Sequence, residues 1–119
     1  MSTDASDRGL GSTLMQQHGD KLYPVAYASR KLNPREEKYS VSERECLSII
    51  WAIKKFYLYL YGKEFILQTD HQSLEYMSTA KFTSAKIMRW SLYLQSFKFR
   101  VQYVRGRDNA CSDFLSRIS

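Results

Sequence analysis

The fold of this chain is decided by residues 39–71, which read YSVSERECLSIIWAIKKFYLYLYGKEFILQTDH. Apolar side chains recur in this stretch at the spacing of one helix face, at Cys46, Ile49, Ile50, Ile53, Phe56, Tyr57 and Leu60. The spacing predicts a helix over residues 40–61. Gly62 ends this helix, and the apolar run over residues 63–69 predicts a buried strand.

Two acids stand at the ends of these predicted elements. Asp70 falls at the carboxyl end of the strand, and Glu45 lies one position before the apolar stripe of the helix. A side chain at that position points along the seam between helix and sheet. Both carboxylates are therefore expected near one spot.

The flanking sequence predicts further elements of an α/β domain. Alternating apolar residues predict two hairpin strands and a later strand, and helical spacing and caps predict the helices. The predicted ranges are strands 10–17, 22–29 and 97–104, one or two helical turns at 72–77, and helices 84–95 and 110–117. The charged run over residues 35–38 is expected to be a solvated loop. Six residues are predicted to be buried: Ile50, Ile53, Phe56, Leu67, Trp90 and Val101.

Length and composition limit the class of protein. A chain of 119 residues that is 44% hydrophobic fits one domain over residues 1–119 with a real core. A net charge of +6 favours a polyanionic partner, nucleic acid before an anionic membrane. Cys46 and Cys111 lack metal-site spacing and predict reduced thiols. No apolar run approaches the roughly 20 residues of a membrane span, so the sequence predicts an intracellular protein without a membrane partner.

Four acids occupy positions from which they could converge: Asp4, Glu45, Asp70 and Asp113. Hard cations such as Mg²⁺ prefer oxygen ligands, and a pair of them can activate water against a phosphodiester. Each acid alone also has an ordinary structural explanation. Asp4 fits a turn, Asp70 and Asp113 fit caps or first-turn acids, and Glu45 could complete a capping box with Ser42.

The order of several separate motifs resembles the ribonuclease H domain of gypsy-type LTR retrotransposon Pol polyproteins. The motifs are Thr3-Asp4-Ala5-Ser6, Gly9-Leu10-Gly11, Ala26-Tyr27-Ala28-Ser29-Arg30, Glu45-Cys46-Leu47, Trp51-Ala52, Thr69-Asp70-His71 and Asp113-Phe114-Leu115-Ser116-Arg117. The resemblance covers nearly the whole chain. It implies a ribonuclease H-like fold, which is a mixed five-stranded sheet flanked by helices.

The resemblance also implies the chemistry and its ligands. Members of this family are hydrolases, endonucleases that cleave the RNA strand of RNA/DNA hybrids with Mg²⁺, or with Mn²⁺ as the second choice. They work beside the reverse transcriptase and integrase domains of one polyprotein, in a cytoplasmic particle or the nucleus. The metal ligands and catalytic acids fall on Asp4, Glu45, Asp70 and Asp113. Glu43 is the rival for the second place, but Glu45 directly precedes Cys-Leu as the family's ligand does.

One departure and one open point accompany the resemblance. The family carries an apolar strand before the first Asp, whereas only Met1-Ser2-Thr3 precede Asp4, so the first strand is expected to be largely missing. Asp4 would then be poorly aimed, and the chain would bind cation weakly and cleave slowly or not at all. The alternative function is a catalytically silent, nucleic-acid-binding or spacer remnant. Arg30 and Lys31 are the candidate substrate-binding residues, because they follow a strand of the catalytic sheet.

Overall fold

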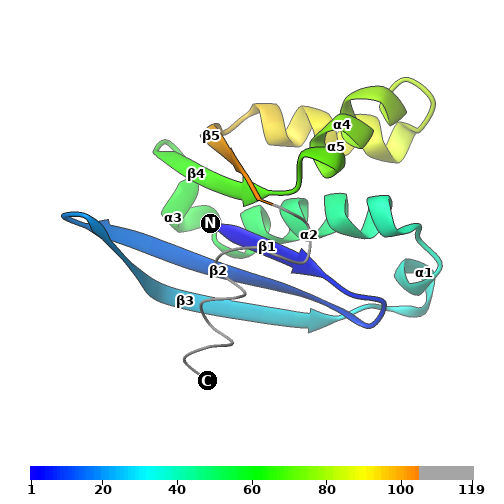
Figure 1. Cartoon of the computed structure of the whole chain (residues 1–119). Coiled ribbons are helices and arrows are strands. Elements are labelled where there is room, and N and C mark those ends of the chain that lie inside the picture. Colours follow the sequence, from blue (N-terminus) through cyan, green and yellow to red (C-terminus); the bar gives the residue numbers. More distant parts are fainter. Residues whose placement is uncertain (105–119) are drawn as a thin grey trace.

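The computed structural model describes residues 1–104 and shows a sheet flanked by helices (Figure 1). The strands are β1 (Ser2–Ala5), β2 (Gly9–His18), β3 (Lys21–Lys31), β4 (Glu64–Thr69) and β5 (Lys98–Tyr103). The helices are α1 (Pro34–Glu37), α2 (Val41–Lys55), α3 (Tyr57–Leu60), α4 (His71–Ala80) and α5 (Ala85–Gln95). The predicted helix 110–117, which carries Asp113, lies outside the described residues.

The strands form one mixed sheet in the order β3-β2-β1-β4-β5. The β2–β3 hairpin is antiparallel, β1 is antiparallel to β2, and β1, β4 and β5 run parallel to one another. Gly19 supports the hairpin turn with φ of 66°, a conformation that glycine adopts at no steric cost. The predicted α/β class and mixed sheet are confirmed, and the predicted strands match the observed ones within a few residues.

The long helix predicted over residues 40–61 is two helices. Ser40 caps α2 in a capping box with Glu43, whose backbone N–H donates to the Ser40 hydroxyl at 3.1 Å. Phe56 leaves helical geometry, with φ of −104° and ψ of 25°, and separates α2 from α3. The apolar stripe nevertheless continues, because Phe56 and Leu60 are both buried.

The core lies where α2 packs on β1 and β2, with α4 and α5 against α2 (Figure 1). Of the six residues predicted to be buried, four are: Ile50, Ile53, Phe56 and Leu67. Trp90 and Val101 are only half-buried. Val101 lies on the edge strand β5, and Trp90 lies at the rim of the core, where its ring meets Tyr39 edge-on at 6.3 Å. Edge and rim positions lack a neighbour on one side.

The charged run at residues 35–38 is not a plain solvated loop. Asn33 caps the one-turn helix α1, and Pro34 occupies its first position. Glu36 of this turn is buried, because Arg30 at the end of β3 holds its carboxylate in two hydrogen bonds of 2.7 and 2.9 Å. The Asn33–Glu36 capping box and Pro34 are local signals of this helix, whereas the burial of Glu36 depends on the tertiary ion pair with Arg30.

The expectation that the first strand is largely missing is wrong for residues 2–5, while the groove beside β4 described below agrees with it for the positions before them. Ser2–Ala5 forms the central strand of the sheet, and all four of its residues pair with β2. The backbone N–H of Gln68 on β4 also donates to the Met1 carbonyl at 2.8 Å. A four-residue segment holds here because it has strands on both sides, so its backbone groups need no further length.

β1 is nevertheless shorter than its neighbours. It pairs with β2 only as far as Thr13, and with β4 only at Gln68. Beyond Met1, β2 and β4, the two neighbours of β1, flank a groove of about 610 Å³, which we call the β2–β4 groove. Its lining includes Leu14, Leu22, Val25, Leu60, Phe65 and Ile66.

Candidate active site at the ends of β1 and β4

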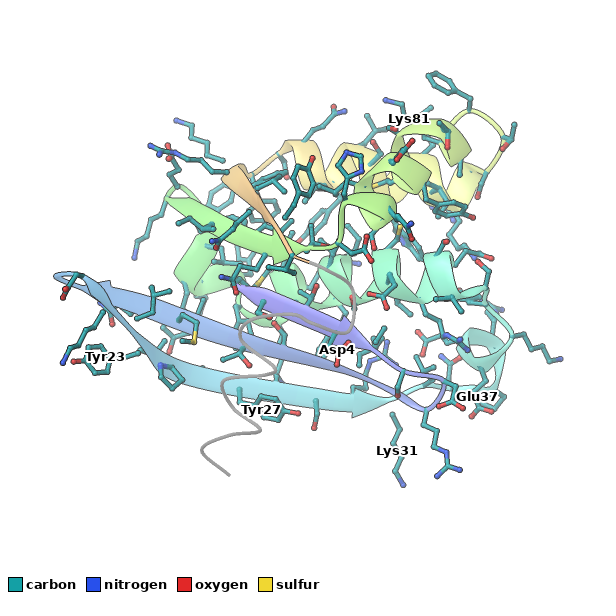
Figure 2. All side chains as sticks on the ribbon, viewed as in Figure 1. Asp4, Tyr23, Tyr27, Lys31, Glu37 and Lys81 are labelled. Atoms are coloured by element: carbon teal, nitrogen blue, oxygen red, sulfur yellow. The ribbon has the colours of Figure 1, made fainter. Side chains whose placement is uncertain are left out.

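Asp4 is held near the carboxyl end of β1, in register with Gly11 on β2. The residue is exposed, and its Oδ1 accepts a hydrogen bond from the backbone N–H of Ala5 at 3.0 Å. Figure 2 shows Asp4 in the middle of the molecule, at the end of the central strand. Backbone pairing of β1 with β2 therefore fixes the position from which the Asp4 side chain extends.

Asp70 follows β4 directly and is the N-cap of α4. Its Oδ1 accepts a hydrogen bond from the backbone N–H of Gln72 at 2.6 Å. The ordinary explanation of this acid as a cap is thus correct, but the second carboxylate oxygen is not used by that bond. A half-buried carboxylate that caps a helix with one oxygen can offer the other to a cation.

Glu45 lies in the first turns of α2 and is half-buried. Its rival Glu43 is already committed, because it completes the capping box with Ser40 and accepts a hydrogen bond from Lys86 Nζ at 2.5 Å. That ion pair, together with the Ser40 bonds, lowers the pKa of Glu43. The capping box with Ser42 is not formed, which leaves the Glu45 carboxylate for another role.

The charges of two other predicted acids act on Glu45. Its pKa is raised from 4.5 to about 7, first by burial and then by the negative charges of Asp4 and Asp70, with Arg44 opposing the rise. Like charges raise a carboxyl pKa only when they are near. Asp4 on β1 and Asp70 at the end of β4 are therefore close enough to Glu45 on α2 for their charges to act on its carboxylate.

The chemistry of this set fits a hard divalent cation, since all three members offer carboxylate oxygens. Within residues 1–104, no three His, Cys, Asp or Glu side chains are arranged as ligands around a single point. Mutual repulsion of the charged forms opposes such an arrangement in the absence of a cation. The fourth predicted ligand, Asp113, lies outside the described residues.

The two candidate substrate residues have different surroundings. Arg30 is engaged by Glu36, and its Nη1 also donates to the Lys31 carbonyl at 3.1 Å. Lys31 is exposed at the end of β3, and Figure 2 shows its side chain pointing away from the body of the molecule. Lys31 is free to reach a ligand, whereas Arg30 also holds α1. A role of either residue in substrate binding stays a prediction.

Two contacts near the acids were missed from the sequence. The Cys46 thiol donates to the Ser73 carbonyl at 3.4 Å, and Lys86 reaches Glu43 while lying 3.6 Å from the centre of the Tyr39 ring. Burial, with Glu45 and Glu43 nearby, raises the pKa of Cys46 to about 12, so its thiol stays protonated. Both contacts join residues that are far apart in sequence, and no local pattern signals them.

Comparison with known proteins gives relatives that are much longer than this chain. The chain is 40% identical over 118 residues to the retrovirus-related Pol polyprotein from transposon 297 of Drosophila melanogaster, and 42% identical over 119 residues to that from transposon 412. It is 39% identical over 123 residues to the transposon Tf2-3 polyprotein of Schizosaccharomyces pombe. These alignments cover 99%, 100% and 99% of the chain, but only 11%, 10% and 9% of the respective relatives.

No helix within residues 1–104 is long and apolar enough to cross a membrane.

The comparisons and the fold agree on the family of this chain. The family described as RNase H-like domain found in reverse transcriptase matches residues 1–97, which include β1 to α5 and three of the four predicted acids. The mixed sheet of five strands with flanking helices is the architecture expected of that family. This chain therefore belongs to the RNase H-like domains found in reverse transcriptase.

Proposed function

We propose that this domain is a metal-dependent endonuclease that cleaves the RNA strand of RNA/DNA hybrids. The observation that carries the proposal is the placement of three acids at the end of β1, the start of α2 and the end of β4, where burial and the charges of Asp4 and Asp70 raise the pKa of Glu45. Isolated structural carboxylates are usually arranged so that their charge is relieved. A domain that keeps three acids close together, one of them largely desolvated, keeps charge that a cation would compensate.

The protein's own residues have distinct parts in this proposal. Asp4 is fixed by the ladder of β1, Asp70 by its cap on α4, and Glu45 by the first turns of α2. We propose that these three and Asp113 hold Mg²⁺, with Mn²⁺ as a substitute. A divalent cation bound there would activate water and stabilise the leaving oxygen of the phosphodiester.

The substrate side of the proposal rests on charge and exposure. Lys31 is exposed at the end of β3, and a net charge of +6 attracts a polyanion. We propose that Lys31 contacts a backbone phosphate of the hybrid and that Arg30 contributes in part by keeping this end of β3 in place. The RNA/DNA hybrid as substrate is supported by membership of the family.

We propose, further, that the domain acts within a Pol polyprotein, beside reverse transcriptase and integrase domains, inside the cell. The relatives named above are Pol polyproteins or transposon polyproteins, and the chain spans about a tenth of their length. A free, buried thiol at Cys46 agrees with a reducing compartment.

Cleavage of a labelled RNA/DNA hybrid tests the proposal. Purified chain with Mg²⁺ or Mn²⁺ should cleave the RNA strand, a chelator should stop it, and Asp70→Asn should abolish it. Asn is a good N-cap residue, so this variant removes a charge without removing the cap. Binding of the hybrid without metal-dependent cleavage would instead support a catalytically silent nucleic-acid-binding domain.

A further inference from the structure

We infer that Cys46 is a positioning residue whose contact with Ser73 sets the separation between the carboxylates of Glu45 and Asp70. The inference rests on the proposed function, because it assigns the contact a purpose in cation binding. Cys46 is not itself a proposed cation ligand and is linked to Glu45 through the backbone of α2.

The contact itself is buried and close. The Cys46 thiol on α2 donates to the Ser73 carbonyl on α4 at 3.4 Å. Cys46 has an exposed fraction of 0% and Ser73 one of 3%, so neither side has water as an alternative partner. The second turn of α2 and the first turn of α4 therefore meet at this sulfur–oxygen pair, inside the close-packed interior.

Each partner is tied to one of the acids by very few bonds. Cys46 directly follows Glu45 on α2, and Ser73 lies in the first turn of α4, which Asp70 caps. The backbone N–H of Ser73 also contacts the Asp70 carbonyl at 3.3 Å. Because the backbone of a helical turn is rigid, a change in the distance between Cys46 and Ser73 shifts the backbone positions from which the Glu45 and Asp70 side chains extend.

The start of α2 is already held by another contact. Lys86 of α5 binds the Glu43 carboxylate, and Glu43 also closes the cap with Ser40. This contact fixes the helix relative to α5 but does not reach α4. Apolar packing of Ile50 and Met77 also holds α2 against α4, and the Cys46–Ser73 pair is a hydrogen bond between the two helices beside the acids.

The size of the side chain explains why cysteine suits this position. Alanine would leave a gap at the helix junction, which neighbouring atoms fill only in part. A β-branched residue would add a methyl group to a fully buried turn and push the helices apart. Serine keeps a hydrogen-bond donor at nearly the same place, so it is the conservative variant.

The experiment compares Cys46→Ala and Cys46→Ser with the control Ile53→Val. Ile53 is a fully buried residue of α2 two turns further along, and the change deletes one methyl group. For each protein we would measure Mn²⁺ affinity by calorimetry, metal-free stability by urea unfolding, and the Glu45–Asp70 carboxylate distance in a metal-free crystal structure.

Cys46→Ala should change the carboxylate distance by more than about 0.5 Å, the tolerance of a preorganised site, and should weaken Mn²⁺ binding about tenfold. Cys46→Ser should stay within about threefold of wild type. Ile53→Val should lose stability without losing affinity. An unchanged carboxylate distance in Cys46→Ala, or equal loss of affinity in the control, would overturn the inference. Wild-type protein that binds no Mn²⁺ would refute the proposed function, while the measured distance would still decide whether Cys46 positions the acids.

Discussion

Among the single residues, Glu45 is an acid whose proton the fold holds well above its ordinary pKa range. Burial and the charges of Asp4 and Asp70 raise its pKa from 4.5 to about 7. Between these two values the folded protein keeps a proton that the unfolded chain has released. Protons therefore stabilise the folded state in this window, and the contribution is lost as the pH rises through about 7.

The first prediction follows from this linkage. Without metal, the free energy of unfolding should fall between about pH 4.5 and 7, by on the order of 2 kcal/mol after allowance for solvent screening. Glu45→Gln should remove this fall and be more stable than wild type above about pH 7. Urea unfolding across the pH range measures it, with the exposed Glu37→Gln as the control. Equal slopes for wild type and Glu45→Gln would show that the group is not destabilised by its surroundings.

A second prediction separates the two neighbouring cations of β3. Arg30→Lys should lower stability by about 1 kcal/mol, because a lysine cannot keep both hydrogen bonds to the buried Glu36. Lys31→Gln should leave stability unchanged, since the bond from Arg30 reaches only the Lys31 backbone carbonyl. Lys31→Gln should instead raise the dissociation constant for an RNA/DNA hybrid about threefold. It should also reduce the slope of log affinity against log salt concentration by about 1.

Filter binding at several salt concentrations and urea unfolding would measure both effects. Lys81→Gln is the matched control, because it removes the same charge at the opposite end of the view in Figure 2. If Lys31→Gln and Lys81→Gln changed hybrid binding equally, the effect would be one of net charge and not of a contact.

Among the secondary-structure elements, β1 carries Asp4 of the candidate site. It is the central strand of the sheet and is shorter than its neighbours β2 and β4. Its ladder to β2 is complete over Ser2–Ala5, so the expectation that residues 1–3 cannot form a strand to hold Asp4 is wrong. The β2–β4 groove shows where the same strand could be longer. Strand pairing and apolar burial there would both favour an extended segment joined to Met1.

A third prediction concerns that groove. Four alternating apolar and polar residues added before Met1 should raise the free energy of unfolding by about 1–2 kcal/mol, once the cost of ordering them is subtracted. An extension of four Gly and Ser residues is the control, because it offers backbone without apolar side chains. Urea midpoints that are equal for the two extensions would mean that the groove does not accept a strand.

Across the whole molecule, the three acids come from β1, α2 and the end of β4, so the proposed cation site would exist only in the folded state. A ligand that binds only the folded protein stabilises it by mass action, about 2.7 kcal/mol when its concentration is 100 times the dissociation constant. The unfolded chain has no such cluster. Thermal melts can therefore report the proposed metal site without any substrate.

The fourth prediction uses this linkage. Millimolar Mg²⁺ or Mn²⁺ should raise the melting temperature of the wild-type protein, and Asp70→Asn should lose most of that rise while keeping its metal-free stability within about 0.5 kcal/mol. Because Asp4 is held in a paired strand, we expect Asp4→Asn to lose the response as well. Glu75→Gln, an exposed acid on α4, should respond like wild type. Melts that do not change with either cation would favour the silent-domain alternative.

Much of the architecture was determined by the sequence itself. The apolar spacing of α2, the alternation of the hairpin strands and the Ser40–Glu43 cap are local patterns, and local geometry turns them directly into helices and strands. The order of the motifs indicated the family. The single helix predicted over residues 40–61 lacks the break at Phe56, because the apolar spacing continues unchanged across that break.

Tertiary structure alone decided the remaining features. Residues 1–3 can hold Asp4 in a strand because β2 and β4 lie on either side of them in the sheet. The length of this segment alone does not reveal those neighbours. The pKa of Glu45, the ion pair of Arg30 with Glu36 and the contact of Cys46 with Ser73 likewise join groups on different elements. Their physical reason is shared: desolvation and charge–charge interaction depend on distance in space, which a chain acquires only when it has folded.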